Sequence, residues 1–205
     1  PETMEACING IGVGFLFAPL YHPAMKFASR ARAELGIRTC FNLLGPLANP
    51  AGVRRQVVGS FSVSAADTLA SILREMRPAA AMVLHAGDGL DEVSPQAPTQ
   101  IREIRESRAE RSYVIDPGTF GLIPEPGLNA VAGGTPARNA AIAREILSGR
   151  APGPARNFVL MNAALGLMVA RDGLTHPEAY ARCAESIDSG RALDSLQRLV
   201  EYTNR

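Results

Sequence analysis

Two groups of residues in this sequence could carry out chemistry, and the first is the acidic pair Asp91 and Glu92. The pair ends the Gly-rich segment Gly87–Glu92, which follows the apolar run Ala79–Ala86. Adjacent side chains on a strand point to opposite faces, but in such a turn both carboxylates can face one cation. Hard divalent ions such as Mg²⁺ take oxygen ligands and often bridge to substrate phosphates. The alternative is a solvated acidic turn, and Asp88 is expected to be solvated in either case.

The second group surrounds a cation on a predicted helix. Met25, Ser29 and Arg32 are spaced by four and three residues, so they share one helix face. An arginine on a face of apolar and small side chains could hold a ligand carboxylate with its bidentate fork. The alternative is a surface arginine whose stem lies along the protein. His22 begins this helix, where a histidine is more often a cap or a packed ring than a catalyst.

The elements that position these residues alternate between strands and helices. Continuous apolar runs are typical of strands buried on both faces, and such strands belong to parallel sheets. A helix from Pro23 to about Leu35 is expected to stop at Gly36, and Ser64 is expected to cap a helix over Ala65–Met76. The predicted buried strands are Ile11–Ala18, Arg55–Ser62 and Ala79–Ala86. The pattern predicts an α/β fold with a largely parallel central sheet flanked by helices.

The apolar stretch Phe41–Pro50 contains chain breakers at Gly45-Pro46 and Asn49-Pro50, so we expect it to be a loop rather than a regular element throughout. A buried loop must satisfy its backbone polar groups. It could therefore line a ligand pocket, or it could be a tightly packed connection. Further along, a hairpin is expected at the sheet edge, over Ile101–Glu106 and Arg111–Ile115, and four helices close the chain.

Composition excludes several classes of protein. The 205 residues carry 21 Lys+Arg and 20 Asp+Glu, a net charge of +1, which gives no basic excess for binding nucleic acid. No apolar run approaches the length of a membrane span. Cys7, Cys40 and Cys183 fit neither a disulfide framework nor a metal-ligand spacing, so we expect a reducing, cytoplasmic compartment.

Several motifs, taken in order along almost the whole chain, resemble one enzyme family. The motif segments are Gly14–Pro19, His22–Lys26, Leu35–Thr39, Phe41–Pro50, Asp88–Glu92 and Ala184–Leu193. The family is anthranilate phosphoribosyltransferase, whose α/β domain is of the type shared with nucleoside phosphorylases. A nucleoside phosphorylase, or a nucleic-acid-binding relative of the same fold, would be the rival interpretation.

The resemblance implies a magnesium-dependent, homodimeric enzyme of tryptophan biosynthesis. Such enzymes transfer phosphoribosyl from phosphoribosyl pyrophosphate (PRPP) to anthranilate, giving N-(5-phosphoribosyl)anthranilate and pyrophosphate. Asp91 and Glu92 match the metal-binding pair. Residues of this sequence that match or adjoin the anthranilate site are Arg32, Ala18, Met25, Gly45, Pro46 and His22.

The sequence also departs from the family pattern. The N-terminal helical domain, the Gly-Thr-Gly-Gly-Asp phosphate loop and the Lys-His-Gly-Asn segment do not occur in residues 1–205. These residues are therefore expected to form most of the C-terminal α/β domain of such an enzyme. Because most PRPP contacts belong to the absent parts, we expect residues 1–205 to be inactive by themselves.

Overall fold

The computed structural model describes residues 2–106, 108–125, 127–151 and 153–204. The chain divides into two compact units, a helical unit (Pro1–Gly52 with Ala192–Arg205) and an α/β unit (Val53–Arg191). The helical unit contains α1 (Glu2–Ile11), α2 (Ala18–Tyr21), α3 (Met25–Leu35), α4 (Phe41–Leu47) and α9 (Arg191–Thr203). The α/β unit contains β1 (Arg55–Gly59), α5 (Val63–Met76), β2 (Ala80–Ala86), β3 (Thr99–Arg105), β4 (Arg108–Ile115), the 3₁₀ turns η1 (Pro117–Phe120) and η2 (Leu128–Val131), α6 (Pro136–Leu147), α7 (Pro154–Ala170) and α8 (His176–Asp188).

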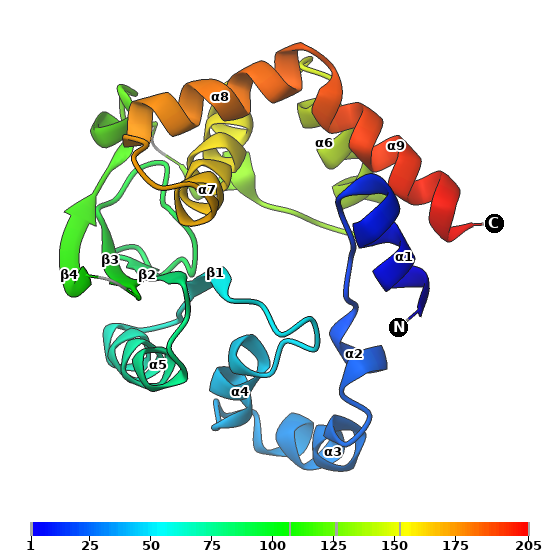
Figure 1. The fold of residues 1–205 in the computed structure, drawn as a ribbon, viewed down its shortest axis with the longest axis vertical. Coiled ribbons are helices and arrows are strands. Elements are labelled where there is room, and N and C mark those ends of the chain that lie inside the picture. The colour runs from blue at the N-terminus through cyan, green and yellow to red at the C-terminus, as the bar shows by residue number, and fades with distance from the viewer. Residues whose placement is uncertain (1, 107, 126, 152, 205) are drawn as a thin grey trace. The chain divides into compact units, whose positions relative to one another are not determined.

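The α/β unit is built on a mixed sheet with strand order β1-β2-β3-β4 (Figure 1). β1 and β2 are parallel, and α5 makes the long crossover that parallel strands require. β3 pairs antiparallel with both β2 and β4, and the β3–β4 hairpin lies at the edge of the sheet as predicted. The α/β architecture with flanking helices is confirmed. In the described residues the parallel part is limited to β1 and β2, because the chain after β2 turns back on itself to make β3.

Helices cover the central strand β2 and bury it almost completely. α5 packs against β2 and β3, and α7 packs against β1 and β2; Figure 1 shows α5 below the sheet and α7 above it. Met82 and Leu84 of β2 share a core cluster with Met161 and Leu165 of α7, and each is at most 1% exposed. Burial of apolar surface stabilises the fold by about 25 cal/mol per Å². β2 and α7 are therefore firmly held supports for the loops at their ends.

The predicted strand Ile11–Ala18 is wrong. Ile11 ends α1, Ala18 begins α2, and the residues between them are irregular. A strand needs a neighbour for its backbone N–H and C=O groups, and in the described residues the strands that pair are β1 to β4. Phe15 and Phe17 are 69% and 51% exposed, which is the opposite of a strand buried on both faces.

The stretch Phe41–Pro50 is mainly helical, so the expected break at Gly45-Pro46 is wrong. Pro46 lies inside α4, where it leaves the preceding turn without one hydrogen bond, but the Ala48 N–H still bonds to the Leu44 carbonyl at 2.9 Å. The break at Asn49-Pro50 is confirmed. There the Asn49 side chain accepts a hydrogen bond from the Ala51 N–H at 3.0 Å and turns the chain.

The ends of the other helices follow local chemistry. α3 stops at Gly36, which has the left-handed φ of 62° expected of a helix C-terminus. Ser62, not Ser64, caps α5, because Ser62 has an extended backbone and accepts a hydrogen bond from the Ala65 N–H at 3.2 Å. The four closing helices are confirmed as α6 to α9. Among the described residues, no helix has both the length and the apolar character required to cross a membrane.

His176, the first residue of α8, should make the α/β unit less stable in mild acid. Its ring packs edge-on against Phe120 at 5.4 Å between centroids, and its Nε2 is buried without a hydrogen-bond partner. Burial lowers the pKa of His176 from its ordinary value of 6.5, although the charge of Glu103 acts in the opposite direction. Protonation thus favours the unfolded chain, and stability present above pH 6.5 is lost as the pH falls through the lower folded-state pKa.

We expect the His176→Phe variant to lose this dependence while it keeps the ring packing. The free energy of unfolding, measured by urea denaturation between about pH 7.5 and 5.5, should fall less steeply in the variant than in the parent protein. Equal slopes in the two proteins would show that His176 does not titrate on unfolding in this range.

Candidate functional site

Asp91 and Glu92 lie where the carboxyl ends of the two parallel strands meet. They belong to the loop between β2 and β3, and both residues are exposed. In the part of the chain that the structure describes, neither carboxylate has an ion-pair partner or a side-chain hydrogen bond. Neighbouring atoms partly desolvate the Glu92 carboxylate, and this, together with the charge of Asp91, raises the pKa of Glu92. A cation would relieve that repulsion.

The acidic pair fits a hard metal ion that completes its shell from outside the protein. Among the described residues, no group of three or more His, Cys, Asp or Glu side chains is arranged to hold a metal. Two neighbouring carboxylates are typical of Mg²⁺ sites, in which waters and substrate phosphates supply the other ligands. The donor set therefore fits Mg²⁺ delivered with a phosphate-bearing substrate.

Asp88 is not solvated as expected, because it organises the loop. Its Oδ2 accepts hydrogen bonds from Ser94 Oγ at 2.6 Å and from Gln96 Nε2 at 3.2 Å. Ser94 is fully buried, and its Oγ also accepts from the backbone N–H groups of Gln96 at 3.1 Å and Ala97 at 2.9 Å. This network closes the loop on the side that follows the acidic pair.

Two further residues hold the loop from outside, and sequence reasoning missed both. Gly59, the last residue of β1, lies against the backbone of Asp91. Asn162 of α7 bonds through its side chain to the backbone N–H of Val93 at 2.8 Å. A glycine within a strand often marks a close backbone approach, so the run Val57-Val58-Gly59 contained a usable signal. Asn162 is a lone polar residue within an apolar helical run, and this too was a usable signal.

The helical unit contains a cavity of about 390 Å³ that gathers most of the residues predicted for anthranilate. It is lined by Ala18, Pro19, His22, Met25, Arg32, Phe41 and Gly45. The lining thus includes every predicted substrate-binding residue except Pro46. The Ser29 side chain, which was expected on the same helix face, lies outside the described residues.

Local helices explain how this cavity forms. α2 and the residue after it supply Ala18 and His22, α3 supplies Met25 and Arg32 two turns apart on one face, and α4 supplies Gly45. A Cβ added to Gly45 would meet no atom within 4 Å, so the glycine leaves open space.

The electrostatics of the cavity favour a planar anion. The Arg32 guanidinium lies over the ring of Phe41, 5.5 Å from its centroid, and no carboxylate among the described residues forms an ion pair with it. This cation–π contact stabilises the guanidinium beside the ring and leaves its N–H groups free to bind a carboxylate. The remaining lining is mostly apolar, which suits the flat apolar body of an aromatic acid.

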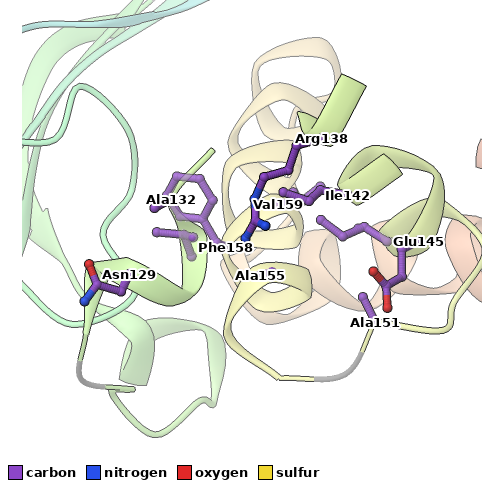
Figure 2. A pocket seen from close by; sticks show the side chains of 11 residues that line it. Asn129, Ala132, Arg138, Ile142, Glu145, Ala151, Ala155, Phe158 and Val159 are labelled. Carbon is purple, nitrogen blue, oxygen red and sulfur yellow. The ribbon is translucent and has the colours of Figure 1, made fainter. Parts of the chain in front are cut away.

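A second cavity, of about 370 Å³, lies in the α/β unit between η2, α6 and α7 (Figure 2). Its lining combines apolar side chains such as Ile142 and Phe158 with the charged residues Arg138 and Glu145. The nearby Gly134 N–H bonds to Asn139 Oδ1 at 2.7 Å. This backbone donor is therefore already used within the chain.

Comparison with known proteins identifies the family. The profile described as "Glycosyl transferase family, a/b domain" matches residues 1–193. The chain belongs to this family. It is 44% identical over 206 residues to an anthranilate phosphoribosyltransferase of Desulfosudis oleivorans, covering 99% of this chain and 59% of the relative. The chain thus spans less than two thirds of the length of the curated relatives it matches.

Solved structures agree with this assignment and confirm the resemblance. Anthranilate phosphoribosyltransferase from Thermus thermophilus matches with a TM-score of 0.90 and 38% identity, over 100% of this chain and 60% of that one. The Saccharomyces cerevisiae enzyme in complex with 4-fluoroanthranilate matches with a TM-score of 0.90 and 30% identity, over 99% of this chain and 58% of that one. The same yeast enzyme in complex with PRPP and Mg matches with a TM-score of 0.84 and 32% identity, over 93% of this chain and 54% of that one.

The network around Ser94 should contribute measurably to stability. The Ser94→Ala variant loses the hydrogen bond to Asp88 and leaves the half-buried N–H groups of Gln96 and Ala97 without their acceptor. We expect the free energy of unfolding to fall by about 1–3 kcal/mol. The control is Ser112→Ala on the exposed face of β4, which should change it by less than about 0.5 kcal/mol. Equal effects in urea denaturation would mean that the Ser94 network does not hold the loop.

Proposed function

We propose that the protein containing this chain transfers the phosphoribosyl group of PRPP to anthranilate, giving N-(5-phosphoribosyl)anthranilate and pyrophosphate in tryptophan biosynthesis. The observation that carries the proposal is the cavity in which Arg32, held over Phe41, faces an apolar lining. An arginine with no carboxylate partner among the described residues favours an acceptor that brings its own carboxylate. A neutral nucleoside, as a phosphorylase would bind, offers none.

The cavity of the helical unit, called the acceptor cavity from here on, is the site at which anthranilate is bound and oriented. Arg32 pairs with the carboxylate, while Ala18, Met25, His22, Gly45 and the neighbouring Pro46 shape the space around the ring. The amino group of the acceptor is neutral and a weak nucleophile, so it needs positioning more than activation. In the reaction the ribose C1–O bond to pyrophosphate breaks, a C1–N bond forms, and the amine nitrogen loses a proton.

Asp91 and Glu92 would hold Mg²⁺ together with the pyrophosphate of PRPP. The ion, when bound, neutralises the negative charge that develops on the departing pyrophosphate. The exposure of both carboxylates leaves them accessible to a metal–phosphate complex. The yeast relative that binds PRPP and Mg supports this assignment.

We further infer that residues 1–205 form most of the C-terminal α/β domain of this enzyme, consistent with the greater length of the relatives. The free thiols Cys7, Cys40 and Cys183 support the cytoplasm as its compartment. Assembly as a homodimer and the absence of nucleic-acid binding stay predictions.

The Arg32→Ala variant of the intact enzyme should lose use of anthranilate selectively. Removing a charge-assisted hydrogen bond removes about 1.5–3 kcal/mol, so kcat/KM for anthranilate should fall about 10- to 150-fold. The KM for PRPP should change little. Arg30→Ala is the matched control, because Arg30 lies on the same helix but is exposed and pairs with Glu34 at 2.7 Å. Unchanged steady-state kinetics for anthranilate in Arg32→Ala would contradict the role.

The double variant Asp91→Asn/Glu92→Gln keeps the shape of the acidic pair and removes its charge. In the intact enzyme, the Mg²⁺ concentration for half-maximal activity should rise and turnover should fall, since the ion loses its protein ligands. The circular dichroism spectrum should stay that of the parent. If the double variant has the same Mg²⁺ dependence as the parent, the pair does not bind the metal and is only a solvated turn.

A further inference from the structure

We propose that Gly59 and Asn162 are positioning residues that fix the backbone of Asp91 and Glu92, and so set the affinity of this pair for a divalent cation. The inference rests on the proposed metal role of the pair. Neither residue is proposed as a ligand of the cation. Each acts on the chain that carries the carboxylates, from a different element of the α/β unit.

Gly59 allows the loop to lie on the end of β1. A Cβ placed on Gly59 would lie 1.8 Å from the Asp91 carbonyl oxygen and 2.8 Å from the Asp91 carbonyl carbon, a separation that real structures do not show. Both are backbone atoms and cannot move aside as a flexible side chain would. Gly59 is not among the glycines with positive φ, so the glycine is needed here for space and not for an unusual backbone conformation.

Asn162 holds the residue directly after the acidic pair. Its Oδ1 accepts a hydrogen bond from the Val93 N–H at 2.8 Å, and its Nδ2 donates to the Val93 carbonyl at 3.4 Å and to the Phe158 carbonyl at 2.9 Å. The amide side chain therefore satisfies both backbone groups of Val93, as a neighbouring strand would. Val93 is fully buried, so these groups have little access to water.

The element that presents Asn162 is itself fixed. Met161 and Leu165, on either side of it along α7, are both 0% exposed in the main core cluster. The loop thus has one contact that limits how close it comes to the sheet, at Gly59, and one that holds it to α7, at Asn162. Between them the two carboxylates stay exposed.

This restraint matters because the arrangement that binds a cation, with both carboxylates held close together, is otherwise unfavourable. Asp91 and Glu92 are adjacent exposed carboxylates, and two like charges so close together repel each other. The preceding turn contains Gly87 and Gly89, and the latter has a φ of 93°, so this turn is intrinsically permissive. A loop held in place before the cation arrives avoids the loss of conformational entropy on binding. Groups that orient metal ligands typically affect affinity about 10- to 100-fold.

The test is Mn²⁺ binding, followed by the loss of the free-ion signal in electron paramagnetic resonance, with and without PRPP. We expect Asn162→Leu to weaken Mn²⁺ binding about 10- to 100-fold relative to the parent. Gly59→Ala should weaken it similarly where the variant folds. The matched control is Asn157→Leu, since Asn157 lies on the same helix and bonds to Glu125 at 2.8 Å and Tyr180 at 2.7 Å rather than to the loop.

The outcomes separate this inference from the proposed function. Asn157→Leu should lower the free energy of unfolding without changing Mn²⁺ affinity, and a merely structural Asn162 would behave in the same way. Mn²⁺ affinity of Asn162→Leu within about twofold of the parent therefore overturns the positioning role, for which a change of about tenfold or more is expected. If the parent and the Asp91→Asn/Glu92→Gln variant bind Mn²⁺ equally, the metal role of the pair fails, and the positioning inference fails with it.

Discussion

The Asp91 carbonyl oxygen occupies the space that a side chain on Gly59 would need. This contact requires that the end of β1 lie beside the loop that leaves β2. The parallel pairing of the strands meets that condition, because it brings Gly59 level with Leu84 near the end of β2. The parallel pairing in turn depends on α5 as the crossover, and on α5 and α7 to bury the sheet. A large part of the α/β unit thus serves to bring two strand ends together.

α7 illustrates how one element serves both folding and function. Its Met161 and Leu165 belong to the core, while Asn162 between them reaches the loop backbone. The charged groups stay in solvent, and the residues that hold them are buried or half-buried. Exposed functional groups on rigid, packed supports are the arrangement expected of a preorganised binding site.

What could be predicted from the sequence depends on how far apart the interacting residues lie. The acceptor cavity is made by residues within Ala18–Gly45, and the helical spacing of Met25 and Arg32 was enough to place them on one face. By contrast, the contacts Gly59–Asp91 and Asn162–Val93 join residues far apart in the chain. A single sequence does not indicate which distant residues come into contact. Apolarity alone also misled at Ile11–Ala18, because a strand requires a partner that the pattern cannot supply. At Gly45-Pro46, one missing hydrogen bond did not end a short helix.

The contacts at Gly59 and Asn162 imply that the loop is ordered before any cation binds. Amide hydrogen exchange of the metal-free chain tests this directly at Val93, whose N–H bonds to Asn162, against the Asp91 and Glu92 amides of the same loop. We expect the Val93 amide to exchange far more slowly than these two neighbours, and the Asn162→Leu substitution to remove the difference. If the Val93 amide exchanges as fast as those of Asp91 and Glu92 in the parent protein, Asn162 does not hold the loop in place before a cation binds.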